Sequence, residues 1–207
     1  MNLESSSLTL RQRQAQQTRE EILTAARSLF VEHGYAQTTV AQIAKQAGVA
    51  VQTVYSSVGS KAEVLVALLE VSRSDAGVPG RDRAAAEAAD PQEIMRTGNG
   101  ILRAVLESSG DVFRLLIDNA AADPDVAAAW ERTKQYIRMG VEAGVRRVDE
   151  LGALAPGLSI DRAVDIISVV LSPRVYLGLL DRGWSHDEIE ALFESMAITT
   201  VLDPAAL

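Results

Sequence analysis

Residues 18–69 read TREEILTAARSLFVEHGYAQTTVAQIAKQAGVAVQTVYSSVGSKAEVLVALL, and this stretch decides the fold. Capping boxes, in which Ser or Thr is followed three residues later by Glu or Gln, start at Thr18, Thr39 and Ser60. Each box predicts the first turn of a helix. Gly34 and Gly48 follow apolar residues at helical spacing and predict where the first two helices end. The stretch therefore predicts short helices joined by tight turns.

The middle of this stretch has the spacing of a helix-turn-helix. The helix that opens at Thr39 stops at Gly48, and about three residues separate that glycine from the apolar set that starts at Val51. In this motif the second helix lies in the major groove of DNA and the first braces it across the backbone. We therefore predict that the helix at residues 50–56 reads DNA.

The same stretch resembles the N-terminal domain of tetracycline-repressor-like (TetR/AcrR family) regulators. The resemblance rests on Phe30 with Gly34-Tyr35, Thr38-Thr39, Ile43-Ala44 with Ala47-Gly48-Val49, and Tyr55 with Ser60-Lys61. It implies that Thr39 and Gln42 touch the DNA backbone and that Gln52 and Thr53 face the groove. It also implies that Tyr55, Ser56 and Lys61 bind phosphates.

Two positions depart from the pattern of that family. The family usually has an aromatic residue where Val58 stands, and a Ser or Thr cap where Ala50 stands. Loss of a helix cap costs about 0.5–2 kcal/mol. These departures keep an alternative open, namely a helical dimeric interaction protein that has lost DNA binding.

Charge is unevenly distributed along the chain. The 207 residues have a net charge of −8, yet residues 11–61 contain six basic and three acidic side chains. Phosphates respond to charge within about 8–10 Å. A locally basic N-terminal module on an acidic body is therefore compatible with DNA binding.

The sequence offers no support for an enzyme. It contains no cysteine, which excludes disulfides, zinc-thiolate sites and thiol catalysis. It contains no His-Glu-x-x-His, Gly-x-Ser-x-Gly or phosphate-loop motif. We expect no cofactor, no metal and no catalytic residue.

No targeting signal is recognisable, because the N-terminus is polar. The most apolar stretch, residues 163–180, is interrupted by Asp165, Pro173 and Arg174. We interpret it as a buried helix rather than a membrane span, and we expect a cytoplasmic protein.

The expected fold class is all-α, with about nine to ten helices in an N-terminal tri-helical DNA-binding domain and a C-terminal bundle. We expect a flexible arm at 1–14, the helix-turn-helix domain at 15–76, a linker at 77–80, and a ligand-sensing and dimerisation domain at 81–207. The expected helices of the bundle are 82–89, 91–108, 111–122, 125–151, 160–182 and 186–202. Pro173 should kink the fifth of these.

The last two helices predict a homodimer. Residues 160–182 are apolar nearly all round and residues 186–202 carry an apolar stripe, so a second subunit is the simplest cover. The residues expected in a four-helix interface are Ile167, Val170, Leu171, Val175, Leu179, Ile189, Leu192, Phe193 and Met196. The alternative is an internal core helix in a monomer.

The resemblance further implies a small apolar effector bound among the central helices. Candidate lining residues are Met95, Leu102, Phe113, Ile117, Trp130, Tyr136, Ile137 and Tyr176, each of which plain core packing would also explain. The implied function is a transcriptional regulator, a repressor released by its ligand, that binds an inverted-repeat operator. The residues do not decide the sign of control.

Overall fold

The computed structural model describes residues 9–206, apart from the side chains of Asp82 and Ala206, and its main elements are α-helices. They are α1 (Leu10–His33), α2 (Val40–Gln46), α3 (Val51–Ser57), α4 (Lys61–Asp75), α5 (Val78–Glu87), α6 (Pro91–Asn119), α7 (Pro124–Glu150), α8 (Ile160–Val170), α9 (Pro173–Leu180) and α10 (His186–Val201). A short 3-10 turn, Pro204–Ala206, follows α10. The all-α fold class is confirmed.

The first helix begins earlier than the sequence predicts. Thr9 caps it, with its side chain accepting from the backbone of Gln12 and the Gln12 side chain accepting from the backbone of Thr9. Thr18 lies inside α1, so the prediction that the helix opens there is wrong. The expected flexible arm is also wrong for residues 10–14, which are helical, while residues 1–8 lie outside the described part of the chain.

The capping boxes at Thr39 and Ser60 are confirmed, and they start α2 and α4. The predicted linker at residues 77–80 is wrong, because α5 begins at Val78. Gly77 adopts the left-handed backbone conformation before it (φ 67°), and proline is tolerated in the first helical turn that follows. Val78 is buried, so the segment packs against the protein.

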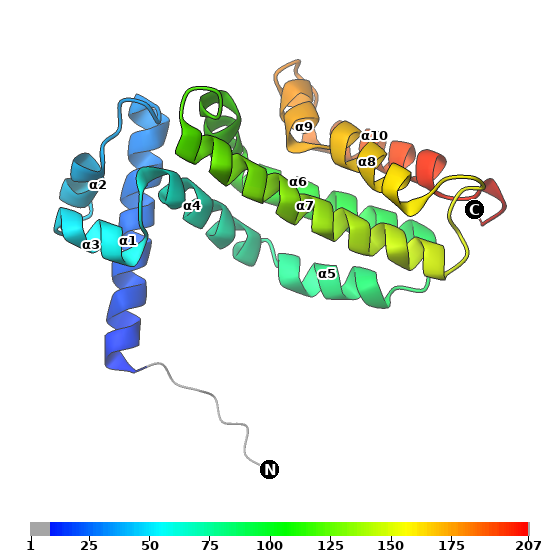
Figure 1. Cartoon of the computed structure of the whole chain (residues 1–207), viewed down its shortest axis with the longest axis horizontal. Coiled ribbons are helices and arrows are strands. Elements are labelled where there is room, and N and C mark those ends of the chain that lie inside the picture. The colour runs from blue at the N-terminus through cyan, green and yellow to red at the C-terminus, as the bar shows by residue number, and fades with distance from the viewer. Residues whose placement is uncertain (1–8, 207) are drawn as a thin grey trace, which may run out of the picture.

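Two long helices, α6 and α7, form the centre of the C-terminal body (Figure 1). Helices α4 and α5 pack along them, and α8, α9 and α10 complete the bundle. The break predicted near Gly110 is a local kink within α6, at Ser109 (φ −141°, ψ 22°). The kink predicted at Pro173 is a complete break between α8 and α9.

Among the described residues, Ile160–Leu180 is the one segment that meets the length and hydropathy of a membrane span. The structure divides this segment at Leu171 and Ser172 into α8 and α9. Helix α8 packs on α7, and α9 packs on α6. The prediction that this segment is buried on most sides is not met within one protomer, because Ile166, Val169 and Val175 are exposed.

Candidate DNA-binding site

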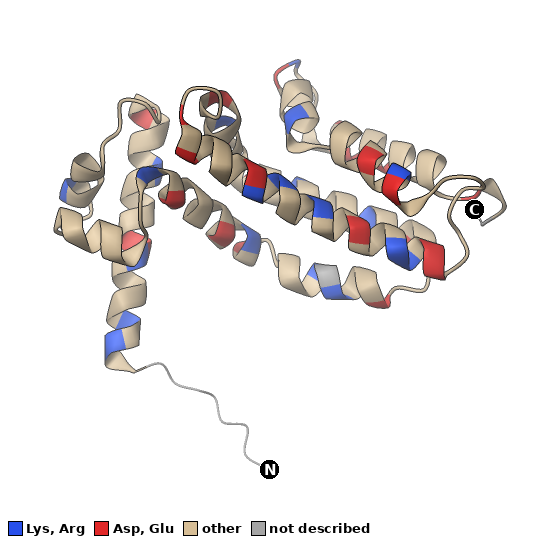
Figure 2. Ribbon diagram, viewed as in Figure 1, with Lys and Arg blue, Asp and Glu red and all other residues tan. Residues whose placement is uncertain are grey.

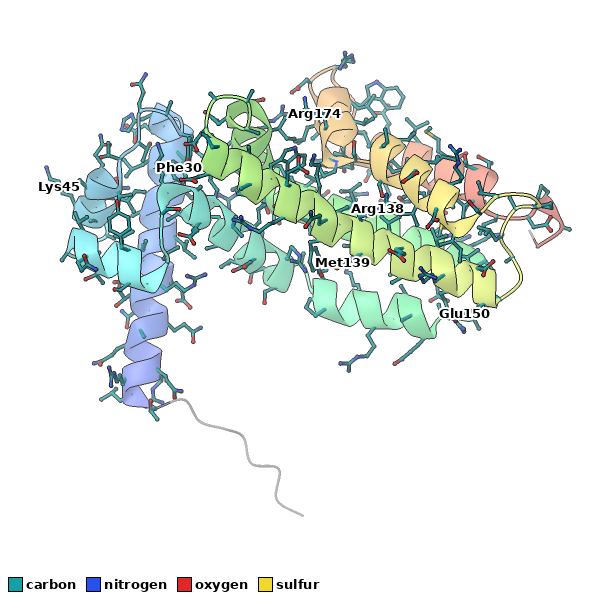
Figure 3. The ribbon with its side chains drawn as sticks, viewed as in Figure 1. Phe30, Lys45, Arg138, Met139, Glu150 and Arg174 are labelled. Carbon is teal, nitrogen blue, oxygen red and sulfur yellow. The ribbon has the colours of Figure 1, made fainter. Side chains whose placement is uncertain are left out.

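The N-terminal domain packs α1, α2, α3 and α4 around a continuous apolar core. Ile22 and Phe30 from α1, Ile43 from α2, Val54 from α3 and Leu65 from α4 are all fully buried. Figure 3 shows the Phe30 side chain in the space between α1 and its neighbours. This core fixes how α3 is presented at the surface.

The two departures from the family pattern do not prevent α3 from forming. Ala50 supplies no side-chain cap, but its carbonyl accepts from the backbone of Thr53 at 2.9 Å and from that of Val54 at 3.4 Å. Val58 is half-buried and packs against the core. The helix-turn-helix geometry of α2 and α3 is therefore complete.

Helix α3 presents a polar, uncharged face. Gln52, Tyr55 and Ser56 are exposed, with Tyr55 50% accessible, and Thr53 is half-buried. The Ser56 hydroxyl donates to the Thr53 carbonyl at 3.2 Å. No basic side chain lies on α3 (Figure 2). Such a face can read base edges through glutamine and hydroxyl groups, but it brings no charge to phosphates.

Thr39 and Gln42 are exposed at the start of α2 and bind each other. The Gln42 side-chain oxygen accepts from the Thr39 backbone at 2.7 Å and from its hydroxyl at 2.8 Å. The Thr39 hydroxyl in turn accepts from the Gln42 backbone at 3.2 Å. Any contact of these side chains with DNA stays a prediction.

Lys61 has a structural role that the sequence did not reveal. Its Nζ donates to the carbonyls of Tyr35 at 2.8 Å and Thr38 at 3.0 Å, and lies 4.0 Å from the centre of the Tyr35 ring. Burial lowers the pKa of this ammonium group. The backbone carbonyls of the loop between α1 and α2 thus already bind the Lys61 ammonium group, which the family resemblance predicted to bind a DNA phosphate.

Arg19 ties α1 to α3. Its Nη1 donates to the Ser57 carbonyl at 3.1 Å, and its Nη2 lies 3.6 Å from the Glu70 carboxylate. Because the Ser57 carbonyl belongs to the last turn of α3, the guanidinium holds that end of the helix against α1.

Arg27 joins the N-terminal domain to the kink in α6. It binds both carboxylate oxygens of Asp111, from Nε at 2.9 Å and Nη2 at 2.8 Å, and Nη2 also donates to the Ser108 carbonyl at 2.6 Å. A second link runs from the Tyr35 hydroxyl, which donates to Asp123 at 3.2 Å, just before α7. Burial, and then the nearby Asp123 carboxylate, raises the pKa of Tyr35.

The residues predicted to bind an effector do not form one cluster. Phe113 packs edge-on against Trp130, with ring centres 6.3 Å apart. Tyr176 packs on Phe193 instead, at 5.7 Å. Tyr136 is exposed and stacks with Arg73 of α4, so its assignment to an interior pocket is wrong.

The other predicted effector residues lie inside the body. Met95, Phe113, Trp130 and Tyr176 are buried, whereas Leu102, Ile117 and Ile137 are half-buried. The larger of two prominent surface hollows, about 660 Å³, lies between α1 and α4 and is lined by none of the eight. Two buried polar atoms of the body lack a hydrogen-bond partner among the described residues, namely the Asn99 amide nitrogen on α6 and the Ser168 hydroxyl oxygen on α8.

The residues predicted for the dimer interface fall into two groups. Leu171, Ile189 and Phe193 are buried within the protomer, so their assignment to a surface is wrong. The remainder are accessible in part or in full, namely Ile167, Val170, Val175, Leu179, Leu192 and Met196. Two exposed apolar residues of α8, Ile166 and Val169, belong to this surface but are absent from the predicted set, and Val169 is 69% exposed.

A tight glycine turn between α2 and α3, a polar face on α3 and a helical body behind them define a helix-turn-helix protein. Residues 22–68 match the family model described as "Bacterial regulatory proteins, tetR family". The N-terminal domain of this chain is therefore similar to the DNA-binding domain of that family.

Individual relatives show the same likeness over part of the chain. The chain is 34% identical over 46% of its length to the HTH-type transcriptional regulator AcrR of Shigella flexneri, and 36% identical over 40% to TtgR of Pseudomonas putida. These matches cover only 43% and 40% of the relatives' own lengths. Among solved structures, the complex of SmeT with triclosan has a TM-score of 0.75 at 20% identity, covering 92% of this chain and 94% of that one. SmeT is described as the repressor of a Stenotrophomonas maltophilia multidrug efflux pump.

Proposed function

We propose that this protein is a transcriptional regulator that binds double-stranded DNA as a homodimer. The observation that carries the proposal is the exposed, uncharged face of α3, held on a rigid core beside α2. Gln52 can bond adenine through two hydrogen bonds, and Thr53 can contact a thymine methyl group. Two subunits related by a two-fold axis would recognise an inverted repeat. Such a role places the protein in the cytoplasm.

The apolar surface of the body supports the dimer. Ile166 and Val169 of α8 and Val175 of α9 are exposed, although the segment that carries them is the most hydrophobic in the described chain. Two-fold pairing of this surface removes apolar area from water in both subunits. The same pairing fixes the distance between the two copies of α3.

We further propose that the regulator is a repressor released by a small apolar ligand. SmeT, which shares the fold, is a repressor and binds triclosan. Here the body has an aromatic interior and one unpartnered amide, while Arg27 and Tyr35 connect it to the DNA-binding domain. A ligand that favours another arrangement of the body would shift the dimer away from the spacing that fits its operator.

Gel-shift titration against the DNA that flanks the protein's own coding region tests this function. We expect a discrete complex with a duplex that contains an inverted repeat, and release of that duplex on addition of triclosan or another apolar compound. Absence of any preferred duplex, in the flanking DNA or in a random library, would favour the helical interaction protein. Binding without release by a broad set of apolar compounds would remove the sensor role and leave the DNA-binding role intact.

A further inference from the structure

The start of α1 extends beyond the domain that it belongs to. The first buried residue of α1 is Ile22, and residues 10–17 are all exposed. In Figure 1 this part of the helix protrudes past α3. Residues 10–17 pack on no other part of the described chain that would explain the length of the helix, so their surface is open to a partner there.

Half of the six basic residues between residues 11 and 61 are already bound by protein groups. Of the six between residues 11 and 61, Arg19 binds Ser57, Arg27 binds Asp111, and Lys61 binds two carbonyls. Arg11, Arg13 and Lys45 are exposed, and the described part of the chain gives their side chains no hydrogen bond or ion pair. Lys45 projects from the outer side of α2, away from α1 (Figure 3).

The extension carries basic charge alone. No acidic residue lies between Thr9 and Arg19. Arg11 and Arg13 lie on nearly opposite sides of the helix, about 200° apart, because each residue turns it by about 100°. Arg19 is the residue that touches the end of α3, and its direction is about 80° from that of Arg11 and about 120° from that of Arg13.

The distances suit a DNA duplex. Arg11 lies eight residues before Arg19, which corresponds to about 12 Å along the helix axis. The major groove is about 12 Å wide. With α3 in the groove, the start of α1 extends about 12 Å beyond the end of α3 and so meets the phosphates at the edge of the groove. Arginine forms strong paired hydrogen bonds with phosphate.

We propose that the start of α1, through Arg11 and Arg13, is a phosphate-binding arm that supplies the charge that α3 lacks. The proposal rests on the proposed DNA-binding function and names the residues that bind the DNA backbone. In this proposal Arg11 and Arg13 bind phosphates in place of Lys61. The arm positions the protein on DNA and contributes nothing to base choice, because phosphates are the same at every step.

The test measures the affinity of the dimer for its preferred duplex by fluorescence anisotropy at several salt concentrations. Replacing both arginines, R11Q/R13Q, removes up to four phosphate contacts per dimer. The slope of log K against log salt should then become shallower by about 3–4 units, at about 0.9 per contact. Sequence preference should not change. The R11K/R13K variant should keep most of the slope, since both charges remain.

R83Q/R132Q is the matched control, because it removes the same charge from exposed arginines of α5 and α7. Its slope should stay close to that of the wild type. Equal slopes for R11Q/R13Q and the control would overturn the arm while leaving DNA binding established. A wild-type protein that binds no duplex would overturn the proposed function and the arm together. Circular dichroism should show the same melting temperature for all variants, because none of these side chains is buried.

Discussion

The N-terminal domain, α1–α4, and the C-terminal body, α5–α10, leave different groups on their surfaces. The N-terminal domain has buried core residues on all four helices and exposes a polar face on α3, together with apolar side chains such as Val31 and Val71. The body leaves Ile166 and Val169 exposed, and the Asn99 amide nitrogen inside it has no partner among the described residues. The N-terminal domain thus presents polar groups that DNA would bind, whereas the body presents groups that a second subunit and a ligand would satisfy.

Two polar links join the two regions, one from Arg27 and one from Tyr35. Arg27 spans the kink of α6 by binding Ser108 on one side and Asp111 on the other. Tyr35 reaches Asp123 from the loop that Lys61 holds. A change in α6 or at the start of α7 would therefore reach the domain that carries α3. This arrangement would give the proposed ligand-induced shift a physical route.

The largest effect should come from the core of the N-terminal domain. Phe30→Ala removes a fully buried ring and should cost about 3–5 kcal/mol of unfolding free energy, with loss of DNA binding. The body should stay folded and dimeric, because α6 and α7 at its centre pack on each other and on α10 and α8. Thermal melts followed by circular dichroism, with sedimentation as the second readout, check this. Val71→Ala, at an exposed position of α4, is the control. Complete unfolding of the whole chain by Phe30→Ala would contradict the division into two regions.

The second effect concerns the apolar surface of the body. Val169→Glu places a charge in each half of the proposed interface, which costs several kcal/mol and raises the dimer dissociation constant on the order of a hundredfold or more. Sedimentation should show the mass falling from about twice 22.2 kDa toward 22.2 kDa, with the helical content kept. Phe193→Glu should unfold the body instead, because Phe193 is 2% exposed. A Val169→Glu protein that remains dimeric would place the interface elsewhere; Val31→Glu on α1 is the control.

The link between the regions should have a smaller effect on stability than on communication. A double-mutant cycle with Arg27→Gln and Asp111→Asn should give a coupling of about 1 kcal/mol in unfolding free energy, since both side chains are partly exposed. Either variant should bind DNA and yet respond less to a ligand that releases the wild type. Chemical denaturation and anisotropy with added ligand measure the two quantities. If the ligand released DNA from both variants as it does from the wild type, the contact between Arg27 and Asp111 would be excluded as the route between the two regions.

The smallest predicted effect separates Lys61 from the arm. Lys61→Met should lower stability by about 1 kcal/mol, through the loss of hydrogen bonds to the carbonyls of Tyr35 and Thr38. The salt dependence of DNA binding should change little. Denaturant titration and the anisotropy series at several salt concentrations check both statements. If Lys61→Met made the slope of log K against log salt shallower by about two units per dimer and left stability unchanged, Lys61 would be a phosphate-binding residue.

Much of the N-terminal fold could be predicted from the sequence because its signals act within a few residues. Capping boxes at Thr39 and Ser60 and the glycine turn at Gly48 need no distant partner. The same kind of signal at Thr9 and Gln12 was present but was overlooked within a Ser- and Gln-rich segment. The composition of this segment therefore predicted a flexible arm where the local capping box indicates a helix.

Side-chain roles were harder to predict because they depend on contacts between distant parts of the chain. Lys61 binds carbonyls more than twenty positions away, and Arg27 pairs with a residue of another domain. The faces of α8 and α10 could not be assigned either. Their apolar stripes do not distinguish a protomer core, which contains Ile189, from a subunit interface, which would use Val169.

The central claim is that α3 reads DNA as part of a two-fold dimer, and selection from a random duplex library tests it most directly. For the wild type we predict enrichment of an inverted repeat. For Gln52→Ala we predict a loss of about 1–3 kcal/mol on the best site, with preference flattened at one position in each half-site. Enriched sites without two-fold symmetry, or a Gln52→Ala protein that selects the same sequence as the wild type, would contradict the claim.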